Sequence, residues 1–120
     1  MSSIALFKSK AFAIRIVRLN QFLRNSKKEY VMSKQLLRCG TSIGANLTEA
    51  RYAVSRNEFL SKTYIALKEA AETLYWLELL HETGYLTDGQ YASITCDAEE
   101  LRRLLSSVTK TMKNAAEERE

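Results

Sequence analysis

Apolar residues recur at helical spacing along almost the whole chain, and no segment shows the strict two-residue alternation of a strand bounded by turn residues. These patterns predict four helices, over about 3–24, 30–53, 56–82 and 88–113, followed by a frayed polar tail over 114–120. The clearest repeat alternates intervals of three and four residues through Tyr91, Ile94, Ala98, Leu101, Leu105, Val108 and Met112. The chain has no proline and four glycines, which agrees with long helices.

Turn and capping signals separate these helices. Ser55 with Glu58, and Thr87 with Gln90, have the spacing of capping boxes, and Gly84 is placed to end the third helix in a left-handed conformation. Because the connections are short, consecutive helices are expected to be antiparallel neighbours. The sequence therefore predicts an all-α protein with the architecture of an antiparallel up-and-down four-helix bundle.

The first predicted helix is apolar on two sides. One stripe consists of Ala5, Phe12, Ile16, Leu19 and Leu23. The other side carries Leu6, Phe7, Ala13, Ile14 and Val17. A single bundle core cannot bury both stripes, so the second one predicts a subunit interface and hence a homo-oligomer.

The second predicted helix contains a polar block at residues 42–50 (SIGANLTEA). On a helix, Asn46 falls on the apolar seam and Glu49 lies at its edge. A buried amide or carboxylate without partners would cost a few kcal/mol, so donors such as Ser42 and Arg51 are expected nearby. The sequence predicts an internal polar network of Ser42, Asn46, Glu49 and Arg51, whose role beyond fixing helix register stays open.

Two glycines lie one turn apart in the same helix, although each costs roughly 1 kcal/mol relative to alanine. Gly40 and Gly44 sit in a run of small residues. A close crossing with another helix is the favoured explanation, and a backbone that faces a ligand is the alternative.

Composition and length favour one domain over 1–120. The chain has 120 residues, of which 46% are hydrophobic, enough for a single core. Basic residues interrupt the apolar segment at the N-terminus, and no apolar run approaches the roughly 18 residues of a membrane helix. A cytoplasmic protein without a membrane partner is expected.

Charge is distributed unevenly along the chain. The net charge is +4, but residues 1–40 carry nine basic side chains and a single acidic one, Glu29. The nine are Lys8, Lys10, Arg15, Arg18, Arg24, Lys27, Lys28, Lys34 and Arg38. Such a segment can bind the phosphates of RNA or DNA, or it can be neutralised by acidic helices of the same bundle or of another subunit.

Residues suited to catalysis are few. His81, the one histidine, lies near the end of a helix, where a cation interacts favourably with the helix dipole. Carboxylate pairs at Glu69 and Glu72, and at Glu99 and Glu100, are typical of solvated helix faces. Cys39 and Cys96 lack metal-ligand spacing and are expected to be buried thiols. We therefore expect no enzyme activity, cofactor, metal or small-molecule substrate.

Aromatic residues offer a second route to nucleic-acid contact. Tyr30, Tyr52, Tyr64, Tyr75 and Trp76 could stack on bases, although aromatics at helical spacing more often belong to a core or an interface.

Three segments carry a resemblance to a known family. They are residues 42–50 (SIGANLTEA), 55–60 (SRNEFL) and 84–86 (GYL), and the resemblance extends over about 35–108. At this spacing they resemble the bacterial four-helix bundle family encoded in intervening sequences of 23S ribosomal RNA genes, also called the S23 family. The family pattern has a glycine where this chain has Ala50.

The resemblance implies an up-and-down bundle that assembles into a ring, a homopentamer in members of the family. It assigns no biochemical role, since the family's link to ribosomal RNA is mainly genomic position. A more distant likeness, to an accessory protein of diversity-generating retroelements, implies a partner role toward nucleic acid and a reverse transcriptase. Together, these features predict a non-catalytic homo-oligomeric accessory or scaffold protein whose basic surface binds RNA or DNA. The alternative is a purely structural protein–protein scaffold.

Overall fold

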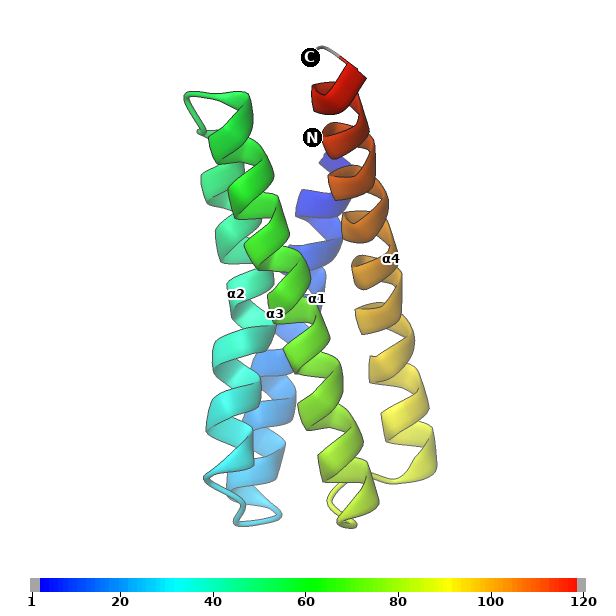
Figure 1. Ribbon diagram of the computed structural model, residues 1–120. Helices are drawn as coiled ribbons and strands as arrows, with labels where there is room; N and C mark the ends of the chain where they lie inside the picture. Colours follow the sequence, from blue (N-terminus) through cyan, green and yellow to red (C-terminus); the bar gives the residue numbers. More distant parts are fainter. Residues whose placement is uncertain (1–2, 119–120) are drawn as a thin grey trace.

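The computed structural model describes residues 3–118, which form four helices packed side by side in an elongated bundle (Figure 1). The helices are α1 (Ser3–Asn25), α2 (Met32–Arg51), α3 (Arg56–Glu82) and α4 (Asp88–Glu118). The described part contains no strand, and the bundle measures 53 × 22 × 22 Å. Each helix runs antiparallel to the one before it, so the prediction of an all-α up-and-down bundle is confirmed.

The helix limits differ from the predicted ones by more than one residue at three places. α2 begins at Met32 instead of 30, because Glu29 caps its first turn, and it ends at Arg51 instead of 53. Beyond Arg51, the N–H groups of Tyr52 and Ala53 bond to carbonyls three residues back, which closes the helix. α4 continues past 113 to Glu118, so the predicted fraying is wrong for 114–118, and 119–120 lie outside the described residues.

One apolar face of each helix points into a shared core. The largest fully buried apolar side chains are Phe12, Ile16, Leu23, Leu36, Ile43, Leu47, Leu77, Leu80, Leu101 and Leu105. Burying a side chain of this size stabilises the fold by about 1.5–3 kcal/mol relative to leaving it exposed. The first stripe of α1 and the α4 residues Tyr91, Ile94, Ala98, Leu101 and Leu105 lie in or against this core, as the sequence predicted. Val108 and Met112, at the far end of the predicted α4 seam, are only half-buried.

α2 approaches α1 closely at Gly40. A Cβ atom at Gly40 would lie 2.8 Å from Cγ1 of Ile16, closer than the packing allows. A Cβ at Gly44 would meet the Ser9 hydroxyl at 3.3 Å. The glycines therefore permit a close helix crossing, which was the favoured explanation.

The connection between α3 and α4 follows the predicted capping signals. Thr87 and Gln90 form a reciprocal capping box, with N–H···O distances of 3.1 Å from the Gln90 N–H to Thr87 Oγ1 and 2.9 Å from the Thr87 N–H to Gln90 Oε1. Gly84 has a φ of 88°, as expected for a left-handed helix end. At the start of α3, the Ser55 hydroxyl accepts a hydrogen bond from the Glu58 N–H at 3.1 Å.

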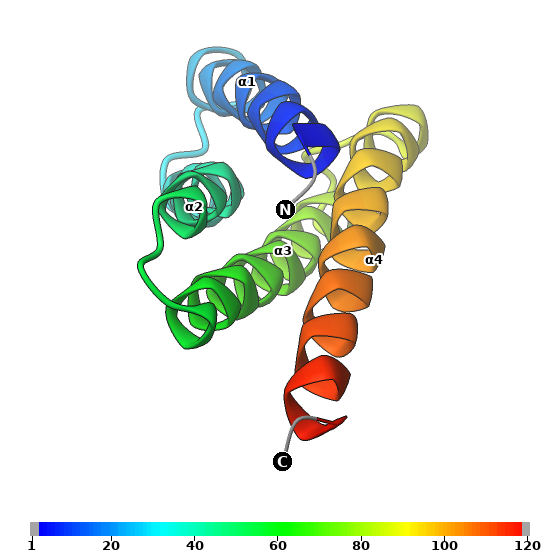
Figure 2. The same ribbon diagram turned by 90° about the horizontal axis from the view of Figure 1, so that it is seen from above.

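The seam between α1 and α4 is the least extensive of the four helix contacts. Seen from above, α4 slants away from α1 toward its C-terminal end (Figure 2). Two ion pairs bridge this seam, Lys8 with Glu100 at 2.6 Å and Arg15 with Asp97 at 2.7 Å. No helix within 3–118 is long and apolar enough to cross a membrane.

Candidate nucleic-acid interface

The α1–α2 connection is tightly closed by a single carboxylate. Glu29 is buried, and its two oxygens accept hydrogen bonds from the N–H groups of Val31, Met32 and Ser33 at 3.1, 3.1 and 2.7 Å. The Ser33 hydroxyl in turn donates to the Glu29 carbonyl at 2.8 Å. Glu29 thus satisfies N–H groups at the start of α2 that have no partner inside the helix, where a negative charge is also favourable.

Hydrogen bonding at Glu29 affects its ionisation. Burial raises the pKa of the carboxyl, but the backbone N–H groups of Ser33, Met32 and Val31 lower it by more, so the pKa lies below its ordinary value. The ionised form is therefore the one that holds the connection in place.

The turn that precedes Glu29 requires an unusual backbone conformation. Lys28 has a φ of 55°, in the left-handed region that glycine occupies far more readily than lysine. The Glu29 N–H reaches back to the Leu23 carbonyl at 2.9 Å, and Asn20 Nδ2 donates to the Ser33 carbonyl at 3.0 Å. These bonds fix the turn against both helices.

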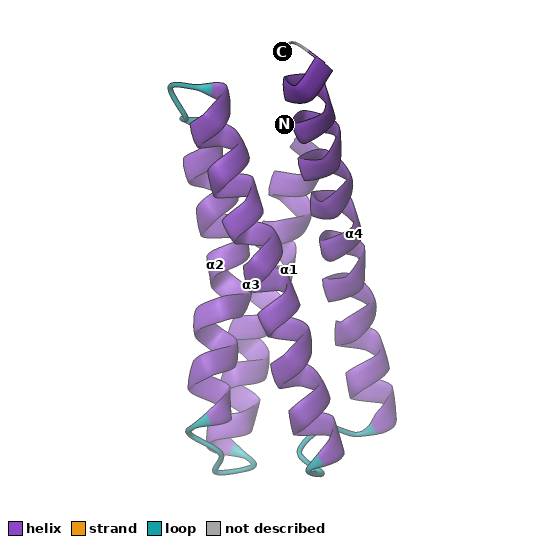
Figure 3. Cartoon of the chain, viewed as in Figure 1, coloured by secondary structure: helices purple, strands orange, loops and turns teal. Residues whose placement is uncertain are grey.

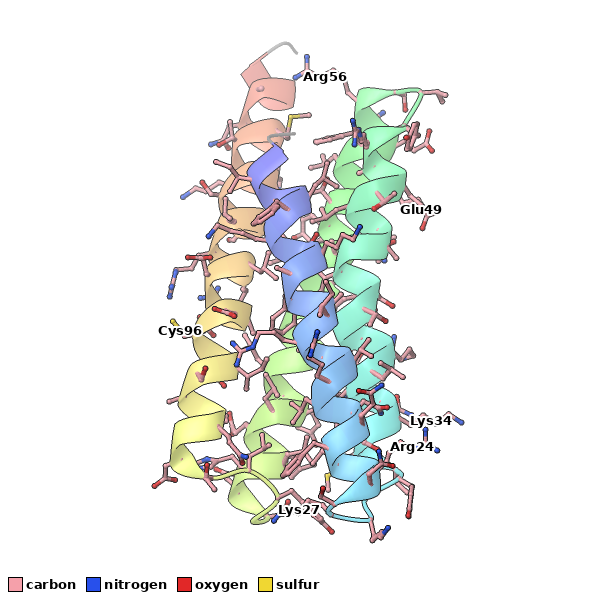
Figure 4. The ribbon with its side chains drawn as sticks, turned by 180° about the vertical axis from the view of Figure 1, so that it is seen from behind. Arg24, Lys27, Lys34, Glu49, Arg56 and Cys96 are labelled. Atoms are coloured by element: carbon pink, nitrogen blue, oxygen red, sulfur yellow. The ribbon has the colours of Figure 1, made fainter. Side chains whose placement is uncertain are left out.

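Four exposed cations surround this turn. They are Arg24, Lys27, Lys28 and Lys34, and we call this group the basic end. Figure 4 shows Arg24, Lys27 and Lys34 at the same end of the bundle, away from Glu49 and Arg56. None of the four forms an ion pair with an acidic side chain of the described residues.

Three of the nine predicted contact residues are instead neutralised inside the chain. Besides the pairs that Lys8 and Arg15 form with α4, Arg38 binds two carboxylates of α3, Glu69 at 3.1 Å and Glu72. Arg38 lowers the pKa of Glu72, and the Trp76 indole N–H, at 2.9 Å, lowers it further. For these three cations, the structure supports the alternative of intramolecular pairing.

Lys10 and Arg18 occupy a different surface. They border a shallow groove on α1 that is also lined by Ala13, Ile14, Val17 and Gln21. Along this side of α1, four large apolar side chains are exposed: Ile4 (55%), Phe7 (76%), Ile14 (47%) and Val17 (40%). We call these four residues the outer face of α1. Phe7, Ile14 and Val17 belong to the second predicted stripe, whereas Leu6 of that stripe packs against the core.

The predicted polar network of α2 is not internal to the chain. Asn46 is half-buried, and its Nδ2 donates to the Ser42 carbonyl at 2.8 Å. Glu49 is exposed and pairs with Lys62 of α3 at 3.1 Å, while Arg51 is exposed as well. Leu47, next to Asn46 on the helix surface, is the residue that enters the core.

The other chemically interesting side chains have structural partners. His81 stacks on Tyr91 with ring centres 4.2 Å apart, and its Nε2 lies 2.7 Å from Asp88 Oδ1. Cys39 is buried, and burial raises the pKa of its thiol to about 11. Cys96 is exposed, which corrects the expectation that both thiols are buried. No group of three or more potential metal ligands occurs in residues 3–118.

Comparison with known proteins assigns the family. The family of 23S rRNA-intervening sequence proteins matches this chain over residues 2–107. The chain belongs to this family. A similar solved structure is the crystal structure of a protein with unknown function from the S23 ribosomal protein family, from Bacteroides thetaiotaomicron VPI-5482. Its sequence is 56% identical to this chain, and the two structures superpose with a TM-score of 0.89. The match covers 90% of this chain and 96% of that one. No curated protein matches. The family has no established function, and neither match indicates a catalytic family or fold.

Sequence reasoning missed Glu29, the residue that shapes the basic end. It was counted only as the one acid among many bases. A carboxylate two to four residues ahead of the first turn of a helix was the signal that could have identified it as a cap.

Proposed function

We propose that the protein is a non-catalytic, cytoplasmic, homo-oligomeric accessory protein that binds RNA or DNA through its basic end. The observation that carries the proposal is the set of four exposed cations, Arg24, Lys27, Lys28 and Lys34, around a turn fixed by Glu29. Cations held on a fixed turn lose little backbone freedom when they bind, and phosphates are the natural ligands of such a cluster.

An oligomer would multiply this binding surface. The outer face of α1 exposes four large apolar side chains along one helix, more than isolated surface residues would explain. Burying them in a subunit contact would add about 1.5–3 kcal/mol for each side chain that becomes fully covered. A ring of copies, a pentamer as the family resemblance implies, would present one basic end per subunit, and several weak contacts would combine into avidity.

The second partner of such a contact is available on α3. Tyr64, Ile65 and Tyr75 are exposed there at 48%, 38% and 58%, and α3 and α1 are diagonal rather than adjacent helices of the described bundle. Two different apolar surfaces favour head-to-tail association, which closes into a ring when the rotation allows it. α1 and α3 point the same way in the bundle (Figure 1), so a rotation about the bundle's long direction would keep the basic ends of all copies on the same side of the ring.

The test is a fluorescence-anisotropy titration with structured RNA, single-stranded RNA and duplex DNA at low and near-physiological salt. The test variant combines Lys27→Glu, Lys28→Glu and Lys34→Glu. Its control combines Arg56→Glu, Lys110→Glu and Lys113→Glu, which changes the charge equally but at the opposite end of the bundle. Oligomeric mass and unfolding midpoint are measured for each protein first.

We expect micromolar or tighter binding by the natural chain that weakens steeply as salt increases. The basic-end variant should lose it, and the control should retain most of it. Equal losses in both variants would show binding to net charge alone, and no binding by the natural chain at low salt would refute the nucleic-acid role.

The second candidate is a protein–protein scaffold, which the outer face of α1 favours. Phe7→Glu with Val17→Glu should lower the oligomeric mass under this function and under the first. An oligomer that binds none of the three nucleic acids would leave the scaffold as the explanation.

A further inference from the structure

Tyr30 is exposed in the α1–α2 connection, the same connection that the basic end surrounds. It is 54% exposed, and the next residue, Val31, is 74% exposed. Tyr30 follows Lys27, Lys28 and Glu29 in the chain and precedes Lys34, so an exposed aromatic residue lies between cations in the sequence. An exposed aromatic side chain at the tip of a connection contributes little to the core and is available to a ligand.

The neighbouring backbone positions Tyr30. Glu29, directly before it, is held by three N–H groups, and one of those belongs to Val31, directly after it. The residues on both sides of Tyr30 are therefore fixed to the start of α2. A ring on a fixed backbone can stack on a partner with little loss of conformational freedom.

The width of the basic end limits the kind of nucleic acid. The α3–α4 connection lies at the same end of the bundle (Figure 3), and exposed acids flank it: Glu78 and Glu82 near the end of α3, and Asp88 at the start of α4. A duplex is about as wide as the bundle, so it would bring its phosphates toward these carboxylates as well as toward the cations. A single strand is narrow enough to follow the α1–α2 connection alone.

We infer that the basic end binds single-stranded nucleic acid, with one base stacked on Tyr30 and the flanking phosphates contacted by Arg24, Lys27, Lys28 and Lys34. This inference rests on the proposed function and specifies its ligand. Unpaired bases expose the flat faces on which aromatic rings stack, and the cations track the backbone without reading sequence.

The experiment compares Tyr30→Leu, Tyr30→Phe and the control Tyr52→Leu. Tyr52 is an equally suitable control because it is 75% exposed at the opposite end of the bundle, directly after α2. Each protein is titrated with an unstructured single-stranded RNA, a single-stranded DNA of the same sequence, and the matching RNA duplex. Unfolding midpoints are measured to show that the variants fold.

Tyr30→Leu should weaken binding to both single strands by about tenfold, which is the order expected for one stacked base. Tyr30→Phe keeps the ring and should remain within about twofold, and Tyr52→Leu should not change affinity. The dependence of affinity on salt should be unaltered in Tyr30→Leu, because the number of phosphate contacts is the same. Binding of the duplex should be weaker in the natural chain and insensitive to Tyr30.

The result separates this inference from the function on which it rests. If Tyr30→Leu binds single strands as the natural chain does, while the triple lysine variant loses binding, stacking is refuted and the basic end remains a phosphate contact. Preferential binding of the duplex would refute the single-strand inference alone. Absence of all binding would overturn both.

Discussion

The two connections at the same end of the bundle are closed by different means and are bordered by side chains of opposite charge. The α3–α4 connection uses a reciprocal capping box of Thr87 and Gln90 together with Gly84, and it is bordered by acids. The α1–α2 connection uses one buried carboxylate, Glu29, and it holds Lys28 at a positive φ that glycine adopts more readily. Each residue of the α3–α4 connection has a backbone conformation that suits its type. In the α1–α2 connection, the exposed Lys28 has a left-handed conformation that is unfavourable for lysine. Departures from local rules are where function is most reasonably sought.

Removing the cap of the α1–α2 connection should have the largest effect. Glu29→Ala leaves the N–H groups of Val31, Met32 and Ser33 without their acceptor, and it should reduce the free energy of unfolding by about 2 kcal/mol. Urea denaturation followed by circular dichroism measures this loss. A change below about 0.5 kcal/mol would mean that water replaces the carboxylate without penalty.

At acidic pH, Glu29 should no longer stabilise the fold more than a glutamine at the same position would. Because the folded pKa of Glu29 lies below its unfolded value of about 4.3, ionised Glu29 contributes stability above that value and loses it as pH falls through the folded pKa. Glu29→Gln should therefore be less stable than the natural chain at pH 7, and the difference should shrink below about pH 4. A difference in unfolding free energy that stays constant from pH 7 to pH 3 would contradict this account.

The capping box of the other connection should matter less. Thr87→Ala removes a hydroxyl that accepts a single N–H, so the expected loss is about 1 kcal/mol, roughly half that of Glu29→Ala. The same urea titration measures it. The comparison between the two connections would collapse if Thr87→Ala proved the more damaging change.

The smallest effect should have the opposite sign. Lys28→Gly relieves the left-handed backbone, and we expect it to stabilise the fold by up to about 1 kcal/mol. The same change should weaken nucleic-acid binding and reduce its salt dependence by about one phosphate contact. Thermal unfolding measures the change in stability, and fluorescence anisotropy on the same preparation measures the change in binding. If the glycine variant were less stable than the natural chain, the lysine side chain itself would be holding the turn.

Much of the fold could be predicted because its signals are local. The capping box at Thr87 depends on a spacing of three residues, and the role of Gly84 depends on its lack of a side chain. The helix pairing followed from short connections. The prediction that Asn46 lies in the core was wrong because Asn46 and Leu47 are consecutive residues of α2. A heptad pattern with one polar member can place either of them on the buried face. The residue that enters the core is decided by the position of α3 and α1, which one helix cannot show.

The candidate site was harder to predict, since it depends on which cations find acids elsewhere in the chain. Lys8 and Arg15 are neutralised by residues more than 80 positions away in the sequence, across a seam that no local pattern specifies. The neighbours of Lys27 and Lys28 in the chain contain no comparable carboxylate apart from Glu29, whose oxygens are engaged by the backbone. The sequence thus identified nine candidates, and the described fold separates those that form ion pairs within the chain, Lys8, Arg15 and Arg38, from the other six.

The seam between α1 and α4 has a mechanical consequence. α1 is joined to α2 by a fixed turn and by the close crossing at Gly40, but it meets α4 over the least extensive contact of the bundle. Opening of the bundle should therefore begin with the separation of α1 from α4, which breaks the ion pairs of Lys8 and Arg15. Backbone amides of α4 near Asp97 and Glu100 should then be the first in the interior to exchange with solvent deuterium, ahead of the amides along the α1–α2 contact.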